Sequence, residues 1–245
     1  MAWTYPRVIA HRCGGALGPE NTLAGLRIAA RLGCRAVEFD AMLAADGVPV
    51  LIHDDTVDRT TDGAGSVAAR TALDLAGLDA GIRHHRAFAG EPVPTLASAL
   101  DLCAHLGLAA NVEIKPAAGS EVATGEAVTA VVEAARLRFP GMPLLLSSFS
   151  RVALGASLRT APALERALLV EEIPEDWRGR IEAQGCIAIH AAGQLLDESL
   201  LAAIAGRGVP VACYTVNRPD LAAHLFGRGV SAVFTDRPDL FPAGD

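Results

Sequence analysis

Residues 36–54, AVEFDAMLAADGVPVLIHD, decide how the rest of the chain is organised. Two apolar runs of extended character, Ala36–Met42 and Val48–Asp54, are separated by a segment that contains Asp46-Gly47. An Asp-Gly turn joins antiparallel neighbours, whereas two parallel strands need a crossover of about a dozen residues or more. We therefore expect the second run to return along the first as a hairpin, which brings His53 back toward the carboxylates of the first run.

Along the rest of the chain, short apolar strands alternate with amphipathic helical segments, for example Asn21–Leu32 and Asp197–Ala205, a pattern typical of a parallel sheet. Apart from the return leg of the hairpin, eight strands are predicted: Arg7–Arg12, Ala36–Met42, Ala110–Lys115, Pro143–Ser148, Arg166–Val170, Cys186–His190, Val211–Val216 and Ser231–Asp236. Eight parallel strands within 245 residues predict an α/β protein with a single domain over residues 1–245, a (β/α)8 TIM-type barrel with a β-hairpin excursion. A turn-rich segment at about 56–94 breaks the alternation and predicts a small insertion after the second strand.

The composition, with 51% hydrophobic and 20% charged residues, is that of an ordinary globular protein. The net charge is −7 and the basic residues are scattered, which argues against a nucleic-acid partner. No apolar run reaches the ~18 residues of a membrane span, and Met1–Arg7 does not resemble the start of a signal peptide, so we expect a cytoplasmic protein. The five cysteines show no C-x-x-C spacing, which favours reduced thiols. The apolar outer helices of a barrel fit a monomer or a homodimer equally well.

Acidic side chains are predicted on the inner wall of the barrel. Glu38 and Asp40 share one face of their strand, and Glu113 and Lys115 share one face of the next parallel strand. Buried carboxylates need a cation, and oxygen ligands suit Mg²⁺ or Ca²⁺ better than zinc. The alternative is a buried salt-bridge network in which Arg12 and Lys115 neutralise the carboxylates.

The basic residues near this cluster indicate an anionic substrate. Lys115 is the only lysine among 21 basic residues, and lysine and arginine differ physically at binding sites. Together with a divalent cation, Arg12 and Lys115 would exceed the charge of the three carboxylates by a single positive charge. A phosphodiester is a monoanion, and the mouths of TIM-type barrels are frequent phosphate sites, so the balance points toward phosphodiester chemistry.

Two histidines and two aromatic residues are predicted at the same mouth. Cleavage of a P–O bond needs a base for the incoming oxygen and an acid for the departing alkoxide, and imidazoles can fill both roles near neutral pH. His11 and His53 lie at strand ends beside the acidic cluster and are the candidates. Phe149 and Tyr214 end two other strands, where they either form an apolar wall for substrate or simply pack.

Ordered motifs spread along the chain carry a family resemblance. They are His11-Arg12, Pro19–Thr22 (PENT), Glu38–Asp40 (EFD), Asp46-Gly47, Val50–Asp55 (VLIHDD), Arg59–Gly63 (RTTDG), Val112–Pro116 (VEIKP), Ser148-Phe149, Tyr214–Asn217 (YTVN) and Phe234–Pro238 (FTDRP). With these motifs the sequence resembles the glycerophosphodiester phosphodiesterases, most closely the cytoplasmic bacterial members.

The resemblance implies a barrel enzyme that uses a divalent metal to hydrolyse glycerophosphodiesters to sn-glycerol 3-phosphate and an alcohol. It assigns metal binding to Glu38, Asp40 and Glu113, acid–base catalysis to His11 and His53, and phosphate binding to Arg12 and Lys115. It also places Glu20 beside the metal, although an acidic residue is favourable at the start of a helix in any case.

Two positions depart from the family pattern. Cys13 stands where the family usually has glycine after His-Arg, and Tyr214 stands where it usually has tryptophan. Neither change removes a residue assigned to catalysis, so both bear on substrate preference rather than on reaction type.

Other functions stay open from the sequence alone. A related phosphodiesterase could act on lysophospholipids or inositol head groups, but a lipid substrate needs an exposed apolar surface and the insertion at 56–94 is polar. A non-catalytic barrel that binds anionic metabolites would not need His11 and His53. A Mg²⁺-dependent aldolase or enolising barrel would share the carboxylates without requiring this histidine pair.

Overall fold

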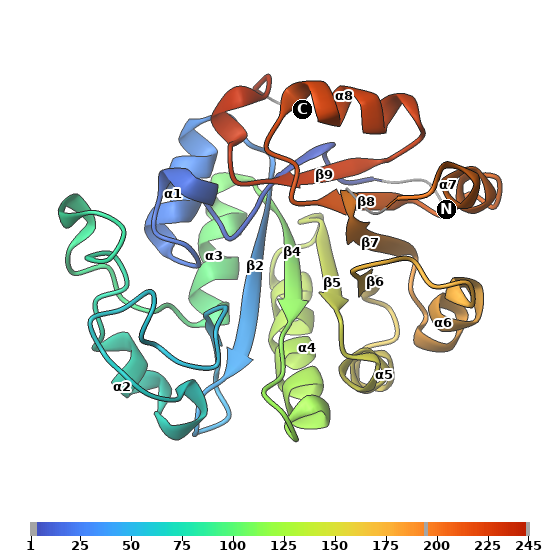
Figure 1. The fold of residues 1–245 in the computed structure, drawn as a ribbon. Helices are drawn as coiled ribbons and strands as arrows, with labels where there is room; N and C mark the ends of the chain where they lie inside the picture. Colours follow the sequence, from blue (N-terminus) through green and yellow to red (C-terminus); the bar gives the residue numbers. More distant parts are fainter. Residues whose placement is uncertain (1–3, 194–195, 244–245) are drawn as a thin grey trace.

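The computed structural model describes residues 4–193 and 196–243, which form a closed barrel of parallel strands with helices outside it (Figure 1). The strands are β1 (Val8–Ala10), β2 (Ala36–Leu43), β3 (Pro49–Leu51), β4 (Ala109–Ile114), β5 (Leu144–Ser148), β6 (Glu165–Val170), β7 (Ala188–Ala192), β8 (Val211–Tyr214) and β9 (Ala232–Thr235). They join in the order β1-β9-β8-β7-β6-β5-β4-β2-β3, and a further pairing of β1 with β2 closes the ring. The predicted (β/α)8 barrel is confirmed.

Helices lie between the strands, and several of them begin at a residue whose side chain caps the first turn. They are α1 (Leu23–Arg31), α2 (Ala72–Ala76), α3 (Leu96–Leu106), α4 (Glu121–Arg138), α5 (Arg151–Thr160), α6 (Trp177–Gln184), α7 (Glu198–Ala205) and α8 (Pro219–Gly227). The side chain of Thr22 accepts a hydrogen bond from the first turn of α1, and Asp197 does the same for α7. Within the described residues, no helix combines the length and the apolar character that crossing a membrane would require.

The hairpin lies where the sequence predicts it. β3 runs antiparallel to β2, with Ala41 opposite Leu51, and stays outside the ring. It is shorter than the predicted run 48–54. The first strand is also shorter than predicted, because it ends at Ala10 and the chain then turns through Arg12 and Cys13, whose φ angles are 47° and 75°. His11 and Arg12 therefore lie in a turn at the mouth of the barrel rather than in a strand.

Side chains alternate between the two faces of each strand. On β2, Val37 and Phe39 face outward into a core shared with Leu26 of α1 and Leu100 of α3. The lower interior is filled by the larger side chains of Ile9, Leu145 and Phe234 among small ones, namely Ala36, Ala109, Ala167, Ala188, Ala212 and Ala232. Tyr5 packs with this interior group, and its hydroxyl donates to Glu165 at 2.7 Å. The interior below the mouth is therefore packed, and the charged side chains of β2 lie above it.

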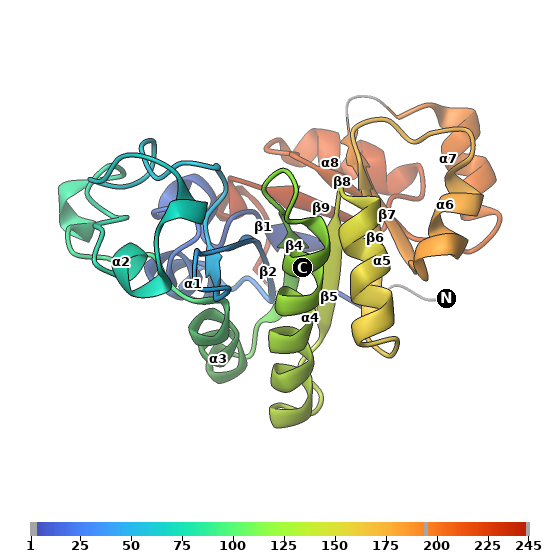
Figure 2. The ribbon, with the colours of Figure 1, turned by 90° about the horizontal axis from the view of Figure 1, so that it is seen from below.

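The insertion at 56–94 forms a lobe beside the barrel, drawn in teal in Figures 1 and 2. It contains α2, and Val57, Val67 and Leu75 pack against Val50 and Ile52 in a core of their own. Large apolar side chains are not confined to that core, because those of Leu73 and Ile82 are exposed. The surface of the lobe is therefore less uniformly polar than the sequence indicates.

Two helical glycines provide a test of how closely α4 and α5 are packed. A Cβ added to Gly125 of α4 would lie 2.6 Å from the carbonyl oxygen of Ala153 in α5, whereas a Cβ on Gly179 of α6 would meet no atom within 4 Å. We expect Gly125→Ala to lower the free energy of unfolding by about 1–3 kcal/mol through overpacking. Gly179→Ala should raise it by about 0.5–1 kcal/mol, because alanine loses less backbone entropy than glycine. Urea denaturation followed by circular dichroism measures both changes, and changes of the same sign would contradict this packing.

Candidate active site

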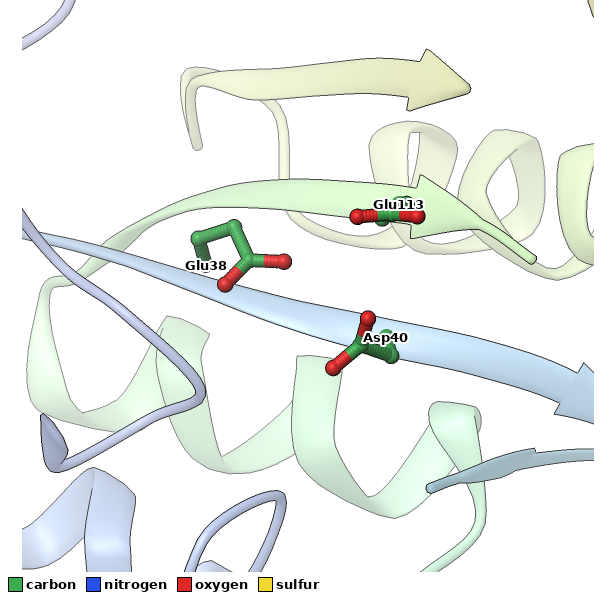
Figure 3. A group of neighbouring side chains, drawn as sticks. All are labelled: Glu38, Asp40 and Glu113. Atoms are coloured by element: carbon green, nitrogen blue, oxygen red, sulfur yellow. The ribbon is translucent and has the colours of Figure 1, made fainter. Parts of the chain in front are cut away.

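Three carboxylates meet where β2 and β4 run side by side. The strands pair in register, so that Asp40 lies opposite Glu113 and Glu38 opposite Asn111. One carboxylate oxygen from each of Glu38, Asp40 and Glu113 lies within 4.8 Å of the others, and all three point to the same side (Figure 3). Burial, together with the charge of Asp40, raises the pKa of both Glu38 and Glu113. A set of oxygen donors this close together, with Glu38 and Asp40 buried and Glu113 half-buried, fits a hard divalent cation.

Asp40 is the most extensively contacted of the three carboxylates. Arg12 Nε lies 3.8 Å from its Oδ2 and Lys115 Nζ lies 3.6 Å from its Oδ1. Asn21 donates through Nδ2 to Oδ2 at 2.8 Å and accepts from the Asp40 backbone N–H at 3.1 Å. The ion pairs predicted as the alternative to a metal therefore exist, but their distances exceed those of direct charge-assisted hydrogen bonds. They are compatible with a further cation among the carboxylates.

His11 is oriented by an aspartate from the other end of the chain. Its Nδ1 lies 2.7 Å from Oδ1 of Asp236, and its Nε2 lies 3.9 Å from Oε2 of Glu38. Asn217 fixes Asp236 in turn, because it accepts from the Asp236 backbone N–H at 2.7 Å and donates to the carboxylate at 3.1 Å. Burial opposes protonation of His11, but Asp236 and Glu38 outweigh it and raise the pKa of His11. This arrangement leaves Nε2 directed at the acidic cluster.

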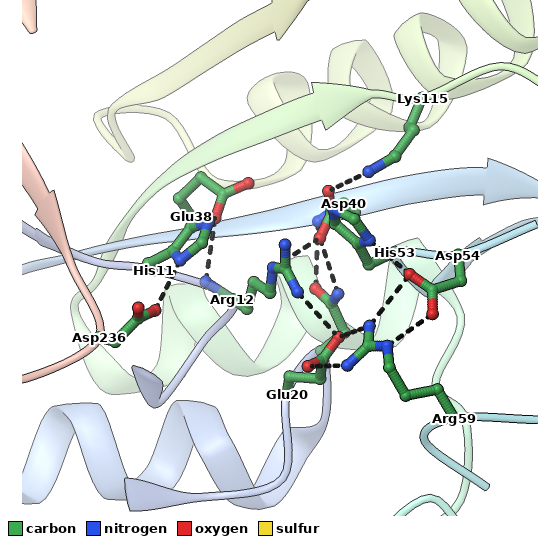
Figure 4. A network of polar contacts seen from close by, with 11 residues as sticks. His11, Arg12, Glu20, Glu38, Asp40, His53, Asp54, Arg59, Lys115 and Asp236 are labelled. Carbon is green, nitrogen blue, oxygen red and sulfur yellow. Dashed lines mark hydrogen bonds and ion pairs between the residues drawn. The ribbon is translucent and has the colours of Figure 1, made fainter. Parts of the chain in front are cut away.

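His53 is held in a similar way by its neighbour in sequence. Its Nδ1 lies 2.6 Å from Oδ1 of Asp54, and burial lowers the pKa of His53 although Asp40 and Asp54 oppose that effect. Asp54 is bound by Arg59, which also binds Glu20, and Glu20 in turn contacts Arg12 (Figure 4). Each histidine thus has its Nδ1 held by an aspartate, which leaves Nε2 for other contacts.

These groups surround one cavity of about 270 Å³ at the mouth of the barrel, the mouth cavity. The predicted site residues that line it are His11, Arg12, Glu38, Asp40, His53, Glu113, Lys115, Phe149 and Tyr214. Glu20 does not line it, and contacts Arg12 and Arg59. Its expected place beside a bound metal stays a prediction.

Two aromatic side chains form another part of the wall of the mouth cavity. The rings of Phe149 and Tyr214 meet edge to face with centroids 6.2 Å apart, and the Tyr214 hydroxyl donates to the carbonyl of Val170 at 2.7 Å. Leu169 and Phe234 also line the cavity, together with the buried His190, whose ring centroid lies 4.9 Å from that of Phe234. The cavity therefore has a charged wall and, around Phe149 and Tyr214, an apolar wall.

Four positioning contacts were not predicted from the sequence. They involve Asn21, Asp54, Arg59 and Asp236, each of which falls inside a motif that carries the family resemblance. Asp54 could have been suspected because it directly follows His53. Sequence spacing gives no sign that Asp236 reaches His11 or that Arg59 reaches Glu20, because each pair joins separate elements of the fold.

Comparison with known proteins identifies a family. The model of the glycerophosphoryl diester phosphodiesterase family matches residues 11–240. The chain is 32% identical to the glycerophosphodiester phosphodiesterase of Caldanaerobacter subterraneus subsp. tengcongensis, over 95% of this chain and 94% of the relative. It is 36% identical to an Oleispira antarctica phosphodiesterase solved in complex with the product sn-glycerol-3-phosphate, with a TM-score of 0.91 over 96% of this chain and 95% of the other. A glycerophosphodiester phosphodiesterase from Agrobacterium tumefaciens has 26% identity and a TM-score of 0.79, over 96% of this chain and 98% of the other.

The motifs, the closed barrel and these full-length similarities agree, and the chain belongs to the glycerophosphoryl diester phosphodiesterase family.

Proposed function

We propose that this protein hydrolyses glycerophosphodiesters to sn-glycerol 3-phosphate and an alcohol, using a divalent cation held by Glu38, Asp40 and Glu113. One observation carries the proposal: a single cavity brings three clustered carboxylates together with two basic residues and two aspartate-held histidines. The Oleispira antarctica relative, solved with sn-glycerol-3-phosphate as its product, supports this choice of product.

The charged wall of the mouth cavity provides for recognition of the phosphodiester. Arg12 offers a planar guanidinium and Lys115 a compact ammonium, and both lie beside Asp40. With a divalent cation bound, the positive charges of the cation and of these two side chains would exceed the negative charge of the three carboxylates by one. The wall would then attract a monoanion. We infer that they bind the non-bridging phosphoryl oxygens and hold the diester over the acidic cluster.

The histidines are placed for the two proton transfers that hydrolysis requires. In our proposal, Nε2 of one histidine takes the proton of the attacking oxygen, and Nε2 of the other gives a proton to the departing alkoxide. Asp236 and Asp54 hold Nδ1 of His11 and His53, so that each ring keeps one orientation during the transfer. The attacking oxygen belongs either to water or to the neighbouring glycerol hydroxyl.

The carboxylate cluster fits Mg²⁺ or Ca²⁺ by its donor set, because all three ligands are oxygens and burial raises the pKa of two of them when no cation compensates their charge. Bound there, such a cation would supply Lewis-acid stabilisation of negative charge on the phosphoryl oxygens. The apolar wall with Phe149 and Tyr214 would receive the carbon skeleton of the substrate.

Two features support this function over the other candidates. Family membership favours an enzyme over a non-catalytic anion-binding barrel, and His11 and His53 would have no evident use in a barrel that only binds.

The cysteines bear on the setting of the reaction. All five are free thiols, which supports a reducing, cytoplasmic setting.

Removal of the metal is the first test of the proposal. We expect purified protein to release glycerol 3-phosphate from glycerophosphocholine or glycerophosphoethanolamine, to lose this activity in EDTA, and to regain it with Mg²⁺ or Ca²⁺. Glu113→Gln should raise the cation concentration for half-maximal activity at least about 10-fold, because it removes one charged ligand. Product release at full rate in EDTA would contradict the proposed dependence on a metal. Folded protein that releases no product with either cation would contradict the proposed glycerophosphodiester substrate.

Replacement of a histidine tests the acid–base roles. His53→Ala should lower kcat by ~10²–10⁴-fold, because it removes a proton-transfer group at the reacting centre. His105→Ala is the matched control, since His105 is exposed on α3 and its Nδ1 contacts the carbonyl of Asp101. Steady-state kinetics with glycerophosphocholine measures both variants. A kcat for His53→Ala equal to that of the control would exclude His53 as a catalytic residue.

A further inference from the structure

We propose that Arg59, a residue of the insertion, is a positioning residue that fixes His53 and Arg12 together through two shared carboxylates. This inference rests on the proposed function, because it assigns to Arg59 the alignment of a proton-transfer group with a phosphate-binding group. Arg59 itself does not line the mouth cavity. It would act through Asp54 and Glu20, which lie between it and the cavity residues (Figure 4).

The guanidinium of Arg59 binds the carboxylates of Asp54 and Glu20 with two hydrogen bonds each. Nε and Nη2 donate to the two oxygens of Asp54 at 2.6 and 3.0 Å. Nη1 and Nη2 donate to the two oxygens of Glu20, both at 2.7 Å. One planar fork thus holds two anions at once, which the ammonium of a lysine cannot do with the same geometry.

The Asp54 branch reaches the proton-transfer group. Asp54 uses Oδ1 both to accept from Arg59 and to hold Nδ1 of His53 at 2.6 Å. Arg59 therefore limits the rotation of the carboxylate that sets the ring plane of His53. Its hydrogen bond is also the main reason that the pKa of Asp54 is lowered, so that this carboxylate stays charged.

The Glu20 branch reaches the phosphate-binding group. Glu20 accepts from Arg12 Nη1 at 3.3 Å, while Arg12 Nε lies 3.8 Å from Asp40. The chain of alternating charges then continues to Lys115, which is 3.6 Å from Asp40. Arg59 occupies the middle of this chain, so loss of its charge would leave Glu20 and Asp54 as neighbouring anions without their shared cation.

The insertion holds Arg59 on a well-anchored turn. The backbone N–H and the hydroxyl of Thr61 both bind the carbonyl of Val57, at 3.0 and 2.8 Å, and the side chains of Val57 and Thr61 are buried. Arg83 of the same lobe donates to the carbonyl of Thr61 at 2.8 Å. The lobe thus gives Arg59 a fixed base from which to reach the barrel.

A positioning role and a purely structural one make different predictions. The Arg59 side chain is 47% exposed, and exposed ion pairs contribute little to the free energy of unfolding. We expect Arg59→Ala to unfold at a urea midpoint close to that of the wild type, yet to lose on the order of 10²-fold in kcat/KM, because misplaced reacting groups are costly. Arg59→Lys should restore the charge but recover only a minor part of the rate.

The two branches can be separated by variants of the shared carboxylates. Asp54→Asn should reproduce mainly the fall in kcat, and Glu20→Gln mainly the rise in KM for the phosphodiester. Adding Arg59→Ala to either variant should cost less than it does alone, because the residues act as a unit. Arg70→Ala is the matched control: Arg70 belongs to the same insertion, its side chain donates to the carbonyl of Ala64, and its loss should leave kcat and KM unchanged.

An NMR measurement tests the inference independently of activity. Long-range ¹H–¹⁵N spectra should show His53 protonated at Nδ1 in the wild type, with the signal identified by its absence in His53→Ala. Arg59→Ala should shift the His53 nitrogens while leaving those of His11 in place, since His11 is held by Asp236.

These measurements separate failure of the inference from failure of the proposed function. Wild-type hydrolysis combined with an Arg59→Ala variant that matches Arg70→Ala in kcat and KM would overturn the inference alone. Wild-type protein that releases no glycerol 3-phosphate would overturn the function, and unchanged His53 nitrogens in Arg59→Ala would then overturn the inference too. If Arg59→Ala does not fold, the Asp54→Asn and Glu20→Gln variants carry the same two measurements.

Discussion

The in-register pairing of β2 with β4 is the constraint on which the site depends. Parallel strands that both alternate inward and outward must place Asp40 directly beside Glu113, with Glu38 one inward position below. Three carboxylates in that arrangement repel one another in a poorly solvated interior. The surrounding groups compensate this charge: Asn21 donates to Asp40, the backbone of Arg12 donates to Glu38, and a divalent cation completes the balance in the proposed enzyme.

The same electrostatic demand explains why the remaining polar groups are arranged in alternating charges. Each histidine has an aspartate on Nδ1, and each of those aspartates has its own donor, Asn217 for Asp236 and Arg59 for Asp54. Hydrogen-bonded partners of this kind restrict a side chain to one orientation. Catalysis depends on such fixed orientations of the reacting groups. The insertion packs mainly around a core of its own, but its Arg59 reaches the barrel and binds Asp54 and Glu20 beside the site.

The sequence predicts the barrel well because two short-range signals are strong. The Asp-Gly turn identifies β3 as a return strand, and the alternation on β2 and β4 places the acidic side chains inward. The sequence predicts a strand through His11 and Arg12, where the structure has a turn. The left-handed residues of this turn are not glycines, so local propensity does not indicate it. The Asp236–His11 and Arg59–Glu20 contacts join elements that only the closed barrel brings together, so no local pattern could reveal them.

Cys13 shows how one departure from the family pattern is accommodated. Its φ of 75° lies in the left-handed region, which glycine adopts at little cost and other residues adopt rarely. The Cys13 thiol is buried, and burial raises its pKa, so it is a packing group rather than a nucleophile. A Cβ on Gly25 of α1 would lie 3.0 Å from the Cβ of Cys13, 3.0 Å from the carbonyl oxygen of Pro19 and 3.1 Å from the backbone nitrogen of Gly14, so the turn as a whole requires glycine at this position of the helix. The position of Arg12 beside the acidic cluster thus depends on how closely α1 packs against this turn.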